Sequence, residues 1–204
     1  MSQDPAPKKT VVTPEDFERK SPIENDYTIM KKINDDRFGE VALIEDKQNH
    51  QQVLMVREKL NTSQKETESD IIQAKQRIKL NHPSLQKMLD FSCTSQRDFC
   101  SKFYKVRGFY EYRSNDLGRE IVSRKKALEH FNSEELTNLL YQSVFGLKHL
   151  QDHGINFADL RPSHISFDNE NNEYKLLDRL KNPSPAFEAN LNNIVVGKKL
   201  YCSP

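Results

Sequence analysis

Two aspartates that could take part in chemistry, Asp159 and Asp178, stand at the two ends of one short stretch of the chain. Between them, apolar residues flank a polar tip at residues 168–173. This arrangement predicts a β-hairpin with an acidic loop at each outer end. Carboxylates in such loops are suited to accept a proton or to bind a hard divalent cation.

The stretch resembles the catalytic core of eukaryotic protein kinases, in which the motifs His-Arg-Asp-Leu-Lys-Pro-x-Asn and Asp-Phe-Gly bracket such a hairpin. Here the first motif reads Phe-Ala-Asp-Leu-Arg-Pro-Ser-His over residues 157–164, and the second reads Asp-Arg-Leu over residues 178–180. The resemblance implies that Asp159 stands at the position of the catalytic base. It also implies that Arg161 replaces a lysine that contacts the transferred phosphate.

Two metal-binding positions also follow from the resemblance. Asp178 would supply one ligand, and His164 stands where the family has an asparagine. Because Mg²⁺ prefers oxygen ligands, an imidazole is a poor replacement there. The phenylalanine of Asp-Phe-Gly is Arg179, which cannot replace a buried apolar side chain unless it finds a partner.

A loop near the N-terminus resembles the glycine-rich loop of kinases, Gly-x-Gly-x-x-Gly-x-Val. Residues 34–41 keep only the third glycine, Gly39, together with Val41. Glycines let backbone amides close on phosphates, whereas Asp35 and Asp36 would bring two carboxylates toward a polyanion. An ordinary acidic turn explains the same residues.

The next strand, residues 54–57, resembles the Val-Ala-Ile-Lys strand, and Arg57 takes the place of its lysine. A guanidinium keeps the charge, but it is larger and planar and is not an isosteric replacement. Counted back from the His-Pro sequence at residue 82, Gln73 falls where the family has a glutamate that pairs with that lysine. Asp70 takes this place if the helix is shifted by one turn.

Residues 109–112, Phe-Tyr-Glu-Tyr, resemble the hinge that joins the two lobes of a kinase. The resemblance places Glu111 and Tyr112 at the nucleotide-binding position. Together with Gly39, Val41 and Arg57, they form a degenerate version of the nucleotide site.

Hydrophobic periodicity and end signals predict the elements that would position these residues. Strands are expected over residues 27–33, 41–44, 53–56, 88–94 and 103–110. Helices are expected over residues 65–80 and 134–152, and a shorter one opens at residues 114–118. For the longest helix, Asn132 and Glu135 form a capping-box pattern and Gly154 marks the end.

Residues 1–25 carry four prolines, many charges and little apolar periodicity, which indicates a flexible tail. Thr13 and Pro14 could begin one helical turn. The dipeptides Thr13-Pro14 and Ser21-Pro22 could be phosphorylated, although a plain linker is the simpler interpretation.

Composition limits the classes of function. The 204 residues carry a net charge of +1, with 30% charged and 35% hydrophobic residues, so nothing favours a nucleic acid or an anionic membrane as a partner. No apolar run approaches the roughly 20 residues of a membrane span, and the first residues lack the apolar region of a signal peptide. Three cysteines without metal-ligand spacing indicate reduced thiols in an intracellular, cytoplasmic protein.

We therefore expect an α+β, two-lobed fold like that of protein kinases over residues 26–204. Its N-lobe, residues 26–110, would hold an antiparallel sheet and one helix. A hinge at residues 111–114 would lead to an incomplete, mainly helical C-lobe at residues 115–204.

The expected function is that of a pseudokinase, a noncatalytic binding or regulatory module with a protein partner. One alternative is a weakly active Ser/Thr-type kinase that uses Asp159 and Asp178 to transfer phosphate from ATP. Another is a fragment of a longer kinase, since the resemblance stops just after the activation-loop region, at residues 200–204. No cofactor is expected, and weak binding of ATP and Mg²⁺ is the alternative.

Overall fold

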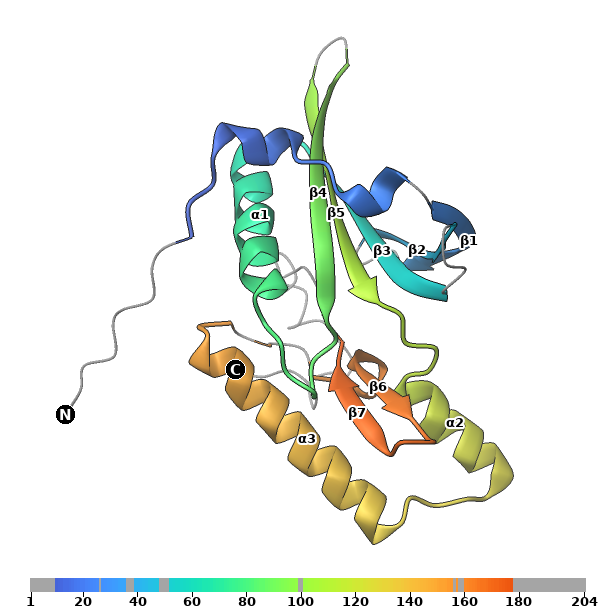
Figure 1. Cartoon of the computed structure of the whole chain (residues 1–204). Coiled ribbons are helices and arrows are strands. Elements are labelled where there is room, and N and C mark those ends of the chain that lie inside the picture. The colour runs from blue at the N-terminus through green and yellow to red at the C-terminus, as the bar shows by residue number, and fades with distance from the viewer. Residues whose placement is uncertain are drawn as a thin grey trace, which may run out of the picture. The chain divides into compact units, whose positions relative to one another are not determined.

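Helices and antiparallel strands build the protein, as predicted (Figure 1). The computed structural model describes residues 10–25, 27–35, 39–47, 52–98, 101–155, 157 and 160–177, with side chains for all of these except 32–35, 39–41, 46 and 52–59. The chain divides into two compact units. Unit 1 comprises Met1–Leu80 and Leu89–Phe109, and unit 2 comprises Asn81–Met88 and Tyr110–Pro204.

A five-stranded sheet forms the framework of unit 1, in the order β1-β2-β3-β5-β4. The strands are β1 (Tyr27–Asp35), β2 (Gly39–Asp46), β3 (Gln52–Asn61), β4 (Met88–Arg97) and β5 (Lys102–Glu111). All five predicted strands are present, and most extend further at both ends. Most residues in these extensions are polar, and hydrogen bonds to a neighbouring strand keep them in the sheet without an alternating apolar pattern.

Helix α1 (Gln64–Ile78) packs in the same unit. It begins after Ser63, whose hydroxyl accepts a hydrogen bond from the backbone N–H of Glu66 at 3.5 Å. Its buried face consists of Thr67, Asp70, Ile71 and Ala74. The helix ends two residues before the predicted boundary, close to the sequence His-Pro, where helical backbone is disfavoured.

Residues 13–25, which we call the strap, differ from the flexible tail expected over residues 1–25. They contain two 3₁₀ helices, Pro14–Glu18 and Pro22–Asn25, and they lie across α1, β4 and β5 in Figure 1. Lys75 of α1 contacts the carboxylate of Asp16 at 2.5 Å, and Arg107 of β5 contacts Glu24 at 2.9 Å. Apolar contacts add to these ion pairs: the ring centroids of Phe17 and Tyr104 are 5.5 Å apart, and Ile23 packs against Ile44 and Phe109.

Unit 2 contains α2 (Leu117–Ala127), α3 (Ser133–Asp152), a 3₁₀ turn (Pro162–His164) and the hairpin of β6 (Ile165–Asp168) and β7 (Glu173–Leu176). The predicted capping box is present: Asn132 and Glu135 exchange side-chain and backbone hydrogen bonds at 2.9 and 2.7 Å. Gly154 follows α3 with φ +71°, a left-handed conformation that glycine adopts readily.

Residues 81–88 connect α1 to β4 and pack in unit 2, against β7 and α3. The N–H of Gln86 donates to the carbonyl of Leu176, and the N–H of Leu176 donates to the carbonyl of Ser84, both at 2.9 Å. Gly146 of α3 lies directly beside them: a Cβ at that position would come within 3.0 Å of the Ser84 carbonyl oxygen. The close approach of the helix therefore favours glycine at residue 146, because a side chain there would push the Ser84 carbonyl aside by a few tenths of an ångström.

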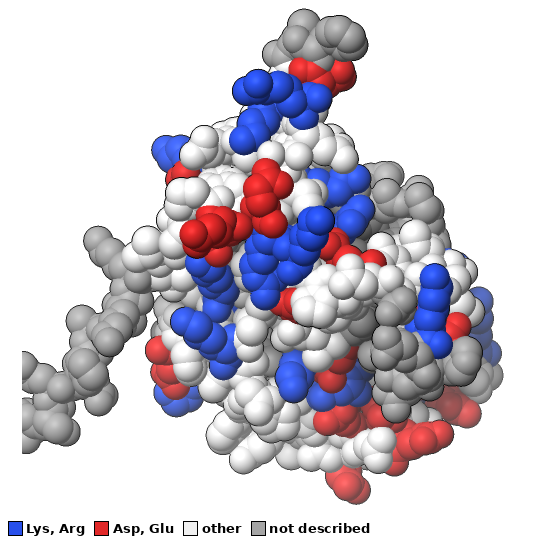
Figure 2. Space-filling view, turned by 45° about the horizontal axis from the view of Figure 1, so that its top comes forward, with Lys and Arg blue, Asp and Glu red and all other residues white. Residues whose placement is uncertain are grey.

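The surface drawn in Figure 2 carries basic and acidic side chains interspersed with one another. This mixture agrees with a net charge close to zero. Within the described ranges, none of the helices is apolar over a length that would cross a membrane.

Helix α3 is apolar on two sides. One side, with Ser143, Gly146 and Leu150, is buried. On the other side the exposed large apolar residues are Leu136, Leu140, Tyr141, Val144 and Phe145, and Leu140 is 67% exposed. Exposed apolar residues that follow one another along a helix favour association.

We predict that the protein self-associates weakly through this exposed side of α3. Replacement of Leu140 and Val144 by glutamate should shift the population toward monomer in sedimentation velocity measured over a range of concentrations. The matched control is Gln151→Glu, which adds a charge at an exposed polar position of the same helix. A wild-type protein that stays monomeric at every concentration would contradict the prediction.

Three histidine rings lie in a row in unit 2. The ring centroids of His82 and His149 are 4.7 Å apart, and those of His149 and His153 are 4.4 Å apart. His82 Nδ1 accepts a hydrogen bond from the backbone N–H of Ser84 at 3.1 Å, so this nitrogen must be unprotonated. Burial lowers the pKa of both His82 and His149, and the neighbouring rings lower the pKa of His149 further.

These lowered pKa values predict a loss of stability in acid. The unfolded chain binds protons at the ordinary histidine pKa of 6.5, above the folded values, so unfolding becomes easier as the pH falls below that point. We expect the free energy of unfolding from urea titrations to be highest above pH 6.5 and to fall toward pH 5.5. His149→Gln should flatten this dependence, and His130→Gln, at an exposed position, should leave it unchanged.

Candidate functional site

In unit 1, the sheet places Val41 opposite Arg57. Val41 of β2 is the Cα partner of Arg57 on one side and of Ile33 on the other. Gly39 is the first residue of β2 and pairs with Asp35. The backbone thus brings the predicted residues Gly39, Val41 and Arg57 onto adjacent strands, while their side chains and residues 36–38 lie outside the described part of the chain.

Asp70 lies on the buried face of α1 and is 4% exposed. Its carboxylate accepts a hydrogen bond from Asn61 Nδ2, at the end of β3, at 2.7 Å. The expected partner position, Gln73, lies one turn further along and is only partly buried. The acidic side chain of α1 that contacts β3 is therefore Asp70. The sequence did not predict Asn61 as its partner.

In unit 2, a backbone hydrogen bond links the last residue of the first motif, His164, to Leu177, the residue before the second motif. The N–H of His164 donates to the carbonyl of Arg161, and the N–H of Leu177 donates to the carbonyl of His164, both at 2.8 Å. Leu177 directly precedes Asp178 in the chain. The hairpin therefore brings the backbone at residue 164 beside Leu177, while Asp159 and Asp178 themselves lie outside the described residues.

His164 is 0% exposed. It ends the 3₁₀ turn that Pro162 begins, and the strand of Ile165 follows at once. An enclosed imidazole offers no oxygen to Mg²⁺, so the residue does not fit the metal position that the resemblance assigns to it. Among the residues with described side chains, no three or more His, Cys, Asp or Glu are grouped so as to hold a metal ion.

Glu111 ends β5 and is bonded on all its polar groups. Its backbone N–H donates to the carbonyl of Lys87 at 3.0 Å, and its own carbonyl accepts from Gln86 Nε2 at 2.9 Å. Its carboxylate accepts from the N–H of Lys87 at 3.0 Å. The neighbouring Tyr112 is partly buried. Glu111 therefore connects the end of β5 to residues 81–88.

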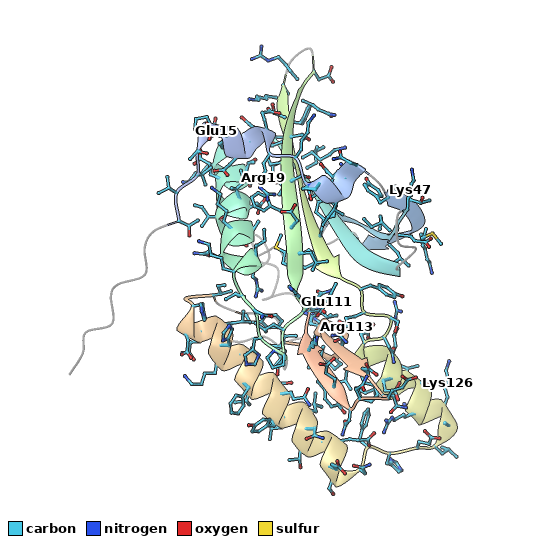
Figure 3. All side chains as sticks on the ribbon, viewed as in Figure 1. Glu15, Arg19, Lys47, Glu111, Arg113 and Lys126 are labelled. Atoms are coloured by element: carbon cyan, nitrogen blue, oxygen red, sulfur yellow. The ribbon has the colours of Figure 1, made fainter. Side chains whose placement is uncertain are left out.

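Glu111 belongs to a cluster of four charged residues of alternating sign. Lys175 Nζ lies 3.3 Å from Glu111 and 3.7 Å from Glu173, and Arg113 contacts the same two carboxylates at 3.5 and 3.0 Å. Figure 3 shows Glu111 and Arg113 side by side next to β7. Sequence reasoning missed this cluster, although Glu173 and Lys175 occupy the same face of a strand, two residues apart, which was a usable signal.

Comparison with curated proteins indicates a kinase-like domain. The chain is 27% identical over 174 residues, 84% of its length, to the ovarian-specific serine/threonine-protein kinase Lok of Drosophila melanogaster. It is 23% identical over 149 residues, 70% of its length, to the sporulation protein kinase mde3 of Schizosaccharomyces pombe. The matched regions span 34% and 25% of those two proteins. No family model matches the chain.

The charge cluster predicts unequal roles for its two acids. Glu111→Ala should lower the free energy of unfolding by about 1–2 kcal/mol, because the Lys87 N–H loses its acceptor and two cations lose a partner. Glu173→Ala, which removes only partly exposed ion pairs, should cost about 0–1 kcal/mol. Urea denaturation at low and high salt measures the loss of stability in each variant. Equal, small losses in the two variants would contradict the unequal roles of Glu111 and Glu173.

Proposed function

We propose that the chain forms a two-lobed, kinase-like domain that binds or regulates a protein partner without catalysing phosphate transfer. The observation that carries this proposal is the complete burial of His164 at the position where the kinase resemblance requires an oxygen ligand for Mg²⁺. Kinase chemistry consists of positioning and charge neutralisation, so loss of a metal ligand removes a central part of it.

Glu111, at the expected nucleotide-binding position, supports the same proposal. Its backbone N–H and carbonyl already have partners within the chain. In the loop at residues 34–41, Asp35 and Asp36 would add negative charge near a polyphosphate. Two unit charges about 5 Å apart repel by roughly 3 kcal/mol at an effective dielectric constant near 20. These features favour weak or absent nucleotide binding.

One alternative is an active serine/threonine kinase that uses Asp159 and Asp178, and the two relatives are themselves named protein kinases. In that case Arg161 would contact the transferred phosphate and Arg57 would replace the strand lysine. In both cases we propose a cytoplasmic protein.

The proposal predicts little or no stabilisation by Mg-ATP. Thermal unfolding with millimolar Mg-ATP should match unfolding without it, because a ligand stabilises a protein measurably only when its concentration approaches or exceeds its Kd. His164→Asn, which restores an oxygen ligand, is the variant in which an Mg²⁺-dependent shift is most expected.

Phosphate transfer to a generic protein substrate, measured with radiolabelled ATP, separates the two functions. Transfer by the wild-type protein that is lost in both Asp159→Asn and Asp178→Asn would refute the noncatalytic proposal. A shift of several degrees with Mg-ATP in the wild-type protein would refute its nucleotide-binding part.

A further inference from the structure

The strap is held on the edge of the unit 1 sheet by one compact set of polar contacts. Arg19 donates to the carboxylate of Asp90 at 2.6 Å and to the carbonyl of Phe91, and its guanidinium lies 4.1 Å from the centre of the Phe91 ring. The carbonyl of Arg19 accepts from the N–H of Cys93 at 2.8 Å. Because β4 is an edge strand, the strap covers backbone groups that would otherwise be open to pairing.

Ser21 lies at the centre of this contact and is 1% exposed. Its hydroxyl donates to the second carboxylate oxygen of Asp90 and accepts from the N–H of Ile23 at 3.3 Å. Its carbonyl accepts from the N–H of Glu24 at 3.0 Å. The hydroxyl therefore acts as a donor toward a carboxylate, at a position closed to solvent.

Ser21 and Pro22 form a Ser-Pro dipeptide, the sequence that proline-directed protein kinases modify. We propose that Ser21 is a phosphorylation site, and that phosphorylation of Ser21 and docking of the strap exclude one another. A phosphoserine has no hydroxyl proton to donate and carries a charge of about −1.5 to −2 at neutral pH. Against the carboxylate of Asp90 it would replace a hydrogen bond by repulsion between anions.

The chemical step requires ATP and a separate, proline-directed kinase. The Ser21 oxygen forms a bond to the γ-phosphorus of ATP, the bond from that phosphorus to the bridging oxygen breaks, and ADP leaves. The hydroxyl proton passes to the base of the modifying kinase. Because Ser21 is enclosed when the strap is docked, only the detached strap is a substrate, and the phosphorylated strap stays detached.

A competing arrangement would tighten the strap instead. Arg19 could leave Asp90 and pair with the new phosphate, since guanidinium groups bind phosphate well. That exchange would leave the carboxylate of Asp90, which is mostly buried, beside a dianion and without its cation. It would also remove Arg19 from the ring and the carbonyl of Phe91. The docked geometry therefore favours detachment.

The experiment uses the full chain with alanine at the other Ser/Thr-Pro positions, Thr13, Ser184 and Ser203, so that Ser21 is the only such target. A proline-directed kinase with Mg-ATP is added, and intact mass and peptide mapping follow the modification. Amide hydrogen exchange is then compared before and after phosphorylation. We expect faster exchange across the strap and at the amide of Cys93, which loses the carbonyl of Arg19.

Two lysine variants test whether detachment precedes modification. Lys75→Met removes the α1 contact of the strap without changing the sequence around Ser21, and should raise the phosphorylation rate by about threefold to fivefold. Lys65→Met, at an exposed position of the same helix, should leave the rate unchanged. No phosphorylation at Ser21 in either variant, or slower exchange of the strap after phosphorylation, would overturn the proposal.

Discussion

The close contact between three segments at Gly146 is the constraint on which unit 2 depends. Residues 84–86 and Leu176 exchange two backbone hydrogen bonds, and α3 passes over them so closely that a Cβ at residue 146 would lie 3.0 Å from the Ser84 carbonyl oxygen. Since backbone groups away from water need partners, these bonds fix residues 84–86 to β7, and α3 packs closely on both at Gly146. The hairpin, with His164 and Leu177 at its open end, takes its position from this contact.

A second group of contacts holds the other end of unit 2. Arg124 of α2 bonds to Glu120 at 2.8 Å and to Glu135 of α3 at 2.6 Å, and its guanidinium lies over the rings of Phe131 and Phe167. The bonds from Arg124 hold the pKa of Glu135 below its usual value. One partly buried arginine thus joins two helices, the loop between them and β6 through charge and aromatic contact.

Prediction from sequence succeeded where apolar residues repeat at a regular spacing. The hairpin at residues 165–176 and helix α3 were both evident from such spacing and from their end signals. The strap was not, because Arg19 and Asp90 lie 71 residues apart and charged residues carry no periodicity that would connect them. The burial of His164 could not be predicted from the sequence either, since burial of a single residue depends on packing between distant segments. The side chains at Gly39, Val41 and Arg57, and the residues Asp159 and Asp178, lie outside the described part of the chain, so their roles stay predictions.

The path of the chain between the two units has a consequence for how the protein could be divided. Residues 81–88 belong to unit 2, although unit 1 supplies the residues on both sides of them, so the chain crosses between the units three times: after Leu80, after Met88 and after Phe109. A single cut, by a protease or by recombination of genes, therefore cannot yield two intact halves. Cleavage after Phe109 would take from unit 2 the residues that pair with Leu176.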